Sequence, residues 1–249
     1  MPKYYFLSDA HIGTRIVADS REHEQRLVSW LDTVRHDATE IFLVGDIFDF
    51  WFEYRRCVPK GYCRLLGKLA ELTDSGIKVH FFIGNHDLWT FGYLEQEIGL
   101  RVYKTPQIFE LLGQRLFITH GDGLNDKSKI FGFTRKLFHS RLMQRCFDFI
   151  HPNIGIPVGR ALSNGNRRKH SYSPYRGEND EPLVEFAKNY PASERIDYFI
   201  FGHRHILLDL RIATGSRVVI LGDFYEEFSY AVLDETGLSL EHFQCQSIG

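Results

Sequence analysis

The sequence predicts an α/β fold built on a parallel β-sheet, with a basic helical insertion in its second half. Three short apolar runs, each followed by polar residues, alternate with two amphipathic segments in the order strand, helix, strand, helix, strand. That order favours parallel strands joined by right-handed crossovers. With 249 residues, of which 43% are hydrophobic and 25% charged, the chain fits one elaborated globular domain.

The individual elements follow from the apolar pattern. Runs of apolar, β-branched or aromatic residues predict strands at 4–7, 41–44, 79–83, 116–119 and 198–201. Helical spacing of apolar residues predicts helices at about 22–35 and 62–74. From residue 207 onward the runs become short and alternating, which predicts antiparallel strands at 207–212, 218–221, 230–233 and 238–243.

The stretch from Lys127 to Arg176 differs in charge from the rest of the chain. It holds eleven basic residues and one acidic residue, Asp148, whereas the whole chain has a net charge of −2. Apolar residues at helical spacing between 130 and 150 predict one amphipathic basic helix. Such a segment is suited to meet anions, although a helix docked on the core with solvated lysines explains the pattern equally well.

Several classes of protein are excluded or disfavoured. No uninterrupted apolar run approaches the roughly 18 residues of a membrane-spanning helix, and the N-terminal apolar run is too short for a signal peptide. The four cysteines form no CxxC pair, so we expect a reducing cytoplasm. The sequence has no Gly-x-Ser-x-Gly elbow and no phosphate-binding P-loop.

Polar motifs follow five of the predicted strands, at the edge of an α/β sheet where functional groups gather. They are Asp9-Ala10-His11, Gly45-Asp46-Ile47-Phe48-Asp49, Gly84-Asn85-His86-Asp87, Thr119-His120-Gly121-Asp122 and Gly202-His203-Arg204-His205. Singly, each is more often a turn than a ligand, but five in this order at strand ends are hard to explain as turns alone. Imidazole, carboxylate and amide groups without thiolate suit Mn²⁺, Fe or Zn²⁺. The sequence therefore predicts a site for divalent metal ions.

The order of these motifs resembles the calcineurin-like metallophosphoesterase superfamily, from Asp9 to His205. The resemblance implies a four-layer α-β-β-α sandwich with a helical lid insertion, the core formed by 1–125 and 178–249 and the lid by 126–177. It implies a hydrolase with two divalent metal ions, Mn²⁺ being expected and Fe or Zn²⁺ the alternatives. The implied ligands are Asp9, His11 and His205 for one ion, Asn85, His120 and His203 for the other, and Asp46 as the bridge.

A site of this kind also needs groups that act on the phosphate. His86, oriented by Asp87, would stabilise the transition-state charge or protonate the leaving oxygen. Asp49 and Asp122 would either orient ligands or simply cap turns.

Within the superfamily the chain most resembles the UDP-2,3-diacylglucosamine diphosphatase family of lipid A biosynthesis. The segments that carry this resemblance are Leu7–Gly13, Gly45–Trp51, His120–Leu124 and Leu221–Phe224. It implies cleavage of that lipid-linked nucleotide sugar to UMP and 2,3-diacylglucosamine 1-phosphate. The implied substrate contacts are Asn85, Asn164, Arg167, Arg168, Lys169 and His203.

The insertion itself points to an amphiphilic substrate. Basic and apolar side chains together suit a phosphorylated head with an acyl tail, and they suit peripheral contact with an anionic membrane. We therefore expect the protein on the cytoplasmic face of the inner membrane, with no nucleic acid and no obligate protein partner. Two alternatives stay open: a soluble phosphoesterase acting on nucleotides or phosphoproteins, and an inactive binding module, which would usually have lost ligands.

Overall fold

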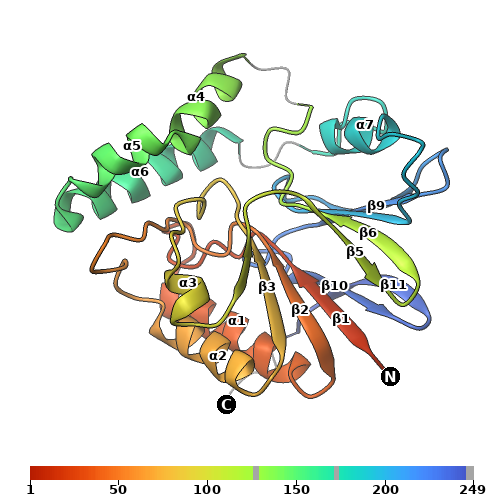
Figure 1. Ribbon diagram of the computed structural model, residues 1–249, viewed down its shortest axis with the longest axis horizontal. Helices are drawn as coiled ribbons and strands as arrows, with labels where there is room; N and C mark the ends of the chain where they lie inside the picture. The colour runs from red at the N-terminus through yellow and green to blue at the C-terminus, as the bar shows by residue number, and fades with distance from the viewer. Residues whose placement is uncertain (126–128, 171–173, 245–249) are drawn as a thin grey trace.

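The chain folds into two stacked β-sheets with helices on their outer faces (Figure 1). The computed structural model describes residues 1–125, 129–170 and 174–244, and the side chains at 129–131, 133–134 and 164–170 lie outside this description. The strands are β1 (Lys3–Leu7), β2 (Ala38–Val44), β3 (Lys78–Phe82), β4 (Arg101–Tyr103), β5 (Gln107–Leu111), β6 (Gln114–Ile118), β7 (Tyr198–Phe201), β8 (Leu207–Arg211), β9 (Arg217–Leu221), β10 (Ser229–Asp234) and β11 (Gly237–His242). One sheet has the order β11-β10-β1-β2-β3-β4 and the other β5-β6-β7-β9-β8.

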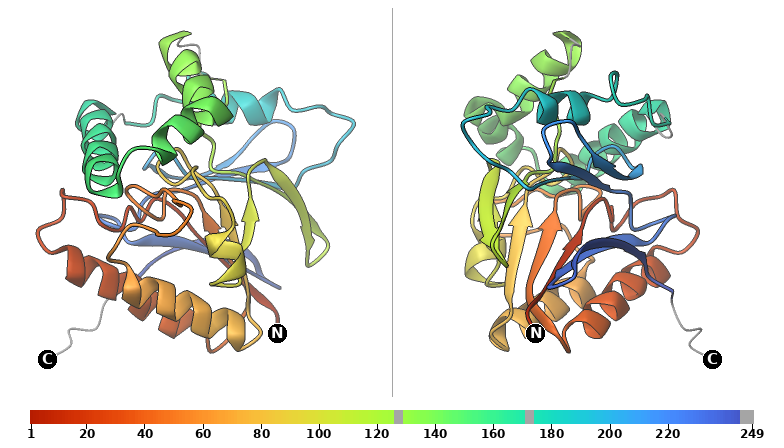
Figure 2. Two further views of the ribbon diagram at one scale, coloured as in Figure 1. Left: turned by 60° about the vertical axis from the view of Figure 1, so that its left-hand side comes forward. Right: turned by 90° about the vertical axis from the view of Figure 1, so that its right-hand side faces the viewer.

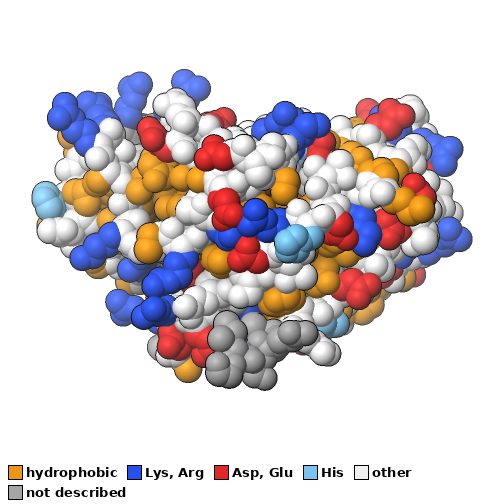
Figure 3. Space-filling model, turned by 90° about the horizontal axis from the view of Figure 1, so that it is seen from below, with side chains coloured by type: hydrophobic (Ala, Val, Ile, Leu, Met, Phe, Trp, Pro, Cys, Tyr) orange, Lys and Arg blue, Asp and Glu red, His pale blue; other side chains and the backbone are white. Residues whose placement is uncertain are grey.

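Helices cover the outer face of each sheet and gather again above the strand ends. The described helices are α1 (Ser20–Val34), α2 (Cys63–Asp74), α3 (Tyr93–Gln96), α4 (Lys129–His139), α5 (Arg141–Asp148), α6 (Pro152–His170) and α7 (Pro182–Lys188). Helices α4, α5 and α6 lie on the side of the molecule opposite α1 and α2 (Figures 1 and 2). On the face seen from below, acidic and basic side chains are interspersed (Figure 3). None of the helices within the described ranges has both the length and the apolar character that a membrane crossing requires.

The core has three apolar layers, and strand β1 shows why. Successive side chains of a strand point to opposite faces of its sheet. Tyr5 and Leu7 pack with the residues of α1 and α2, whereas Phe6 packs between the two sheets with residues of β6, β7 and β9. A third layer packs α7 against the outer face of the second sheet. The predicted four-layer α-β-β-α sandwich is therefore confirmed.

The parallel arrangement positions the functional edge. β1, β2 and β3 are parallel neighbours in the first sheet, as the alternation of strands and helices predicted. β6, β7 and β9 are parallel neighbours in the second sheet. The carboxyl ends of each set therefore share one edge, and the loops that follow β1, β2, β3, β6 and β7 carry all five polar motifs.

The C-terminal strands do not behave uniformly as antiparallel strands. β10 and β11 pair antiparallel and join the first sheet beside β1, whereas β8 pairs antiparallel with β9 in the second sheet. β9, however, runs parallel to β7, so the antiparallel prediction is wrong for this pair. Alternation along a strand reports which side chains are buried, not the direction of the neighbouring strand. The short strands β4 and β5 were not predicted.

The stretch predicted as one helix over 130–150 is divided into two helices, α4 and α5, and a third helix, α6, follows them in the insertion. The break falls at Ser140, whose backbone is extended (φ −68°, ψ 124°) and which precedes α5. Phe147 of α5 packs on Phe52 and Trp89, aromatic residues from the loops after β2 and β3. On α6, an added Cβ at Gly159 would collide with the ring of Phe50. Aromatic side chains therefore hold the insertion closely against the loops that carry the second and third motifs.

Candidate metal centre

The polar side chains of the motifs meet at the carboxyl ends of the parallel strands. β1 leads into Asp9 and His11, β2 into Asp46, β3 into Asn85 and His86, β6 into His120, and β7 into His203 and His205. Five of these residues have a left-handed backbone, namely Asp9, His11, Asp46, His203 and His205, with φ between 46° and 68°. Residues other than glycine adopt this conformation at a cost, and such residues cluster at functional sites. The backbone thus turns sharply where these side chains must converge.

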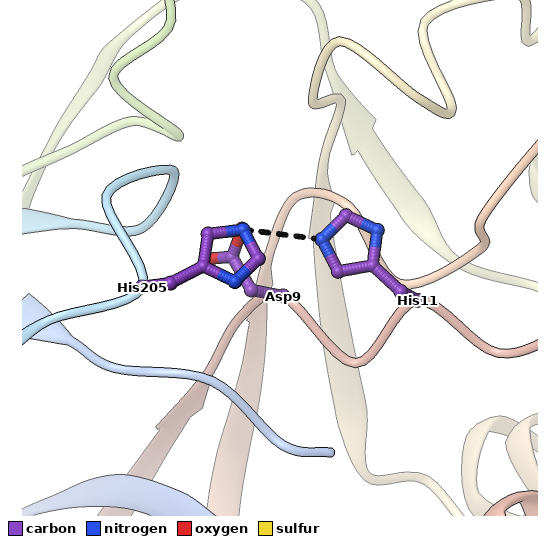
Figure 4. Close-up of side chains that lie close together, drawn as sticks. All are labelled: Asp9, His11 and His205. Carbon is purple, nitrogen blue, oxygen red and sulfur yellow. Dashed lines mark hydrogen bonds and ion pairs between the residues drawn. The ribbon is translucent and has the colours of Figure 1, made fainter. Parts of the chain in front are cut away.

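Asp9, His11 and His205 form one compact group (Figure 4). The Nε2 atoms of the two imidazoles lie 3.4 Å apart. Asp9 Oδ1 lies 3.2 Å from His205 Nε2 and 3.6 Å from His11 Nε2. Ligand atoms about 2 Å from a common ion, at the angles of tetrahedral coordination, are separated by about 3.3 Å, so the spacing of these three atoms fits a metal ion.

A second group forms around Asp46, whose side chain reaches both parts of the cluster. Its Oδ2 lies 3.3 Å from His120 Nε2 and 3.8 Å from His11 Nε2. Asp46, His120 and His203 can hold one ion, and His11, Asp46 and His86 form a further set with the same spacing. His86 Nε2 lies 3.9 Å from Asp46 Oδ2, so His86 belongs to the cluster by distance.

Three buried side-chain atoms of the motif residues have no hydrogen-bond partner among the residues that the structure describes. They are Asp9 Oδ1, Asn85 Oδ1 and His120 Nε2. Leaving buried polar atoms without a partner is costly, and each such atom needs an explanation. All three are lone-pair donors of the kind that divalent cations bind, so the residues present fit the metal ions that the sequence predicts.

The two cluster carboxylates are held in their charged form. Burial disfavours the charge on Asp46, but the imidazoles of His120 and His86 outweigh it and keep the pKa of Asp46 well below its usual range. Burial likewise opposes ionisation of Asp9, and the neighbouring His205 reverses the effect, so the pKa of Asp9 also falls well below normal. Ionised carboxylates are the form that coordinates metal.

The pKa shifts of His203 and Asp87, in contrast, favour the neutral forms of these two side chains. Burial, and next the neighbouring His120, lower the pKa of His203 to about 4, which keeps this imidazole neutral and able to ligate at neutral pH. Burial, and next the charge of Asp46, raise the pKa of Asp87 to about 7. Bound cations would neutralise the charge of Asp46 and so reduce its part of the Asp87 shift, whereas the larger part, which comes from burial, would remain.

Contacts on the far side of two imidazoles turn their Nε2 atoms into the cluster. His120 Nδ1 donates to the Val44 carbonyl at 2.9 Å, because a carbonyl can only accept, and in the neutral imidazole, the form that binds metal, this leaves the Nε2 lone pair facing the cluster. His205 Nδ1 lies 2.9 Å from the hydroxyl of Tyr225. Sequence reasoning missed Tyr225, although the Leu221–Phe224 segment beside it was among those carrying the family resemblance.

The expected pairing of His86 with Asp87 is wrong. The Asp87 carboxylate accepts from the backbone amides of Gly84 at 2.7 Å and Ile47 at 2.8 Å, with longer bonds from Asp46 and Phe48. It therefore ties two motif loops together. His86 Nδ1 instead lies 2.9 Å from the Asp49 carbonyl and 2.7 Å from Ser163 Oγ on α6.

The expected substrate contacts divide into two sets. His203 belongs to one of the groups with metal-ligand spacing, and Asn85, in the loop after β3, has a buried Oδ1 without a hydrogen-bond partner among the described residues. Asn164, Arg167, Arg168 and Lys169 lie in the last part of α6, where side chains are outside the described residues. Ser163, one residue before them, was not predicted, because its spacing carries no signal of the contact with His86. Asp122 accepts from Arg135 Nε on α4 at 3.0 Å, which favours a structural link to the insertion.

Comparison with known proteins agrees with this geometry. A family model of calcineurin-like phosphoesterases matches residues 2–207. The chain belongs to the calcineurin-like phosphoesterase family. It is therefore a metal-dependent hydrolase, and the prediction of divalent metal ions is confirmed at that level.

Three curated relatives carry the same description, UDP-2,3-diacylglucosamine hydrolase. The chain is 41% identical to that of Porphyromonas gingivalis, over 97% of this chain and 98% of the relative. It is 24% identical to that of Shewanella baltica, over 95% of both chains. It is also 24% identical to that of Photorhabdus laumondii, over 96% of this chain and 98% of the relative.

Proposed function

We propose that the protein hydrolyses the pyrophosphate bond of UDP-2,3-diacylglucosamine, releasing UMP and 2,3-diacylglucosamine 1-phosphate in lipid A biosynthesis. The observation that carries the proposal is the 41% identity, over nearly the whole of both chains, to a hydrolase described by that substrate. The cluster of buried carboxylates and imidazoles at the strand ends supplies the chemistry that such a hydrolase needs.

We assign the cluster to two metal ions, with Mn²⁺ as the expected metal. Asp9, His11 and His205 would hold one ion, Asn85, His120 and His203 the other, and Asp46 would contact both. Two divalent ions in such a site lower the pKa of a water molecule and neutralise charge on phosphoryl oxygens. The distances from Asp46 Oδ2 to His120 and His11 support its place between the two groups.

His86 is the residue of this chain best placed to act on the leaving group. The Asp49 carbonyl can only accept, so His86 Nδ1 carries a proton toward it. The opposite ring atom, Nε2, faces Asp46 and the cluster. With both ring nitrogens protonated, it can donate from there to a phosphoryl oxygen, or deliver its Nε2 proton to the departing oxygen and remain as the neutral imidazole. Ser163 holds the same Nδ1 atom from α6, so the insertion contributes to the orientation of this ring.

The insertion offers an apolar surface suited to acyl chains and to a membrane. Leu142, Phe149, Ile154 and Leu162 on α5, α6 and the turn between them are all more than half exposed. Exposed large apolar side chains in such numbers mark a binding surface. Arg141 and Arg145 lie beside them on α5 and are exposed too. We therefore place the protein peripherally on the cytoplasmic face of the inner membrane, with Arg167, Arg168 and Lys169 as further contacts for phosphate.

The test is an assay of the purified protein with Mn²⁺ on UDP-2,3-diacylglucosamine in mixed micelles. We expect UMP as a product, formed far faster than from the water-soluble UDP-N-acetylglucosamine. Failure to cleave the lipid substrate, with efficient cleavage of soluble nucleotides, would replace this function with that of a soluble phosphoesterase. Inactivity on every phosphate ester with every metal would leave only a binding role.

A further inference from the structure

An ion pair outside the metal cluster holds the loop that carries two of the candidate ligands. Arg204 donates through Nε to Glu181 Oε1 at 2.6 Å and through a terminal nitrogen to Glu181 Oε2 at 3.1 Å. The Glu181 side chain is 0% exposed and that of Arg204 is 14% exposed. A bidentate, buried pair of this kind has a fixed geometry as well as a strong attraction.

Arg204 lies between His203 and His205, and both of these neighbours have a left-handed backbone conformation. His203 has a φ of 68° and His205 a φ of 49°, each costly for a residue with a side chain. Backbone bonds hold the start of the loop, since His203 N donates to Asp9 Oδ2 at 2.9 Å and Arg204 N to the Gly202 carbonyl at 2.8 Å. The guanidinium adds a side-chain anchor at the middle of the loop.

We propose that Glu181 is a positioning residue of the metal centre, which fixes His203 and His205 in their ligating orientation by clamping the guanidinium of Arg204. The inference rests on the metal assignment proposed above. Glu181 lies 23 residues before Arg204 and directly precedes α7. It therefore also connects the point where the chain returns from the insertion to the metal-binding loop.

The burial of the two partners sets which substitutions are informative. If Arg204 is truncated, the Glu181 carboxylate stays buried without its partner, which is strongly destabilising. If Glu181 is changed, the partly exposed guanidinium can turn toward water. Glu181→Gln keeps the volume and loses the charge, whereas Arg204→Lys keeps the charge and loses the forked geometry. These two variants test the clamp with little change in packing.

The experiment is titration of the metal-stripped protein with Mn²⁺, with free Mn²⁺ measured by electron paramagnetic resonance. Loss of a contact that orients ligands weakens metal binding by about 10- to 100-fold, and we expect Glu181→Gln and Arg204→Lys to fall in this range. Activity at limiting Mn²⁺ should fall in parallel and recover with excess Mn²⁺. The matched control is Arg217→Lys, because Arg217 forms a similar pair with Asp209 at the amino end of β9.

The outcomes separate this inference from the metal assignment. If the native protein binds fewer than two ions, the assignment itself is wrong. If the native protein binds two, and Glu181→Gln and Arg204→Lys bind them with native affinity, the positioning role of Glu181 is overturned. Equal weakening in Arg217→Lys would also overturn it, because the effect would then reflect general stability. Should Arg204→Lys fail to fold, Glu181→Gln and Glu181→Ala decide the question.

Discussion

Asp46 is the side chain on which both halves of the cluster depend. Its Oδ2 approaches His120 and His11, and its Oδ1 accepts from the backbone amide of His86 at 2.8 Å. Asp46→Asn keeps that hydrogen bond and the volume of the side chain, but it removes the charge that two cations would share. We expect weakened binding of both ions and a fall in kcat of at least about 100-fold, the range typical of losing one transition-state stabilising group.

The measurements for Asp46→Asn are metal content and turnover at saturating Mn²⁺. Asp32→Asn, at a half-exposed position of α1 where the carboxylate pairs with Lys68, is the control for loss of one carboxylate and should keep native metal content and turnover. Two tightly bound ions and native turnover in Asp46→Asn would contradict the proposed bridge.

At the residue scale, the sequence identified donor types but not their mutual contacts. Asp9, His11 and Asp46 could be singled out because each follows an apolar run that predicts a buried strand. The Tyr225 contact with His205 could not, because it joins residues across a turn whose shape the sequence does not specify. The same holds for Ser163, which reaches His86 from a helix 77 positions along the chain.

At the scale of one strand, His80 of β3 links stability to pH. Its ring stacks on Phe42 with 4.4 Å between centroids, and Nε2 lies 2.8 Å from Glu40 Oε2. Burial lowers the pKa of His80 and outweighs the opposing effect of Glu40. A folded-state pKa below the unfolded value means that the contribution to stability is complete above the unfolded pKa, near 6.5. It is then lost as the pH falls toward the folded-state value.

We therefore expect His80→Phe, which keeps the ring stacking, to lose less stability than the native protein as the pH falls from 7 to 5. Urea unfolding at several pH values measures this directly. Val219→Ala, a change in the same apolar layer without a titrating group, should leave the pH dependence unchanged. A native protein and a His80→Phe variant with parallel pH profiles would refute the role of His80.

The insertion shows what decides whether a helical pattern becomes one helix or several. The spacing of apolar residues was the same on both sides of Ser140, so periodicity alone could not place a break there. The docking of α5 on the core fixes the position of the break. Phe147 of α5 is 7% exposed and packs among Phe52, Tyr54 and Trp89. Phe138 of α4 contributes its carbonyl to Trp89 Nε1 at 2.8 Å.

Phe147→Ala should therefore loosen the insertion without unfolding the sheets. Truncation of a buried phenylalanine costs about 3 to 5 kcal/mol, and here the loss falls on contacts between α5 and the core. Hydrogen exchange is the measurement: amides in α5 and α6 should exchange faster, while those in α1 and α2 keep their protection. Leu142→Ala, at a position 72% exposed on the same helix, is the control. Uniform acceleration throughout the chain would argue against independent docking.

At the scale of the whole molecule, charge is separated between the core and the insertion, and this was visible in the sequence before the fold was known. The parallel pairing of β1, β2 and β3 was also predictable. Strand-like and helix-like apolar patterns alternate there over long segments, and that order is read directly from the sequence. The direction of β9 and the existence of β4 were not predictable, because both depend on which strands become neighbours.

The charge separation leads to a prediction about membranes. Arg141 and Arg145 are exposed on α5 beside Leu142 and Phe149. Each basic residue near an anionic lipid surface contributes about 1 kcal/mol, so Arg141→Ala/Arg145→Ala should weaken binding to vesicles containing anionic lipid about 30-fold. Cosedimentation with vesicles of neutral and mixed composition measures this, and rising salt should reduce native binding.

The matched control is Lys78→Ala/Arg195→Ala, which removes two charges near the amino ends of β3 and β7. Equal binding by both double variants would exclude α5 as the membrane contact.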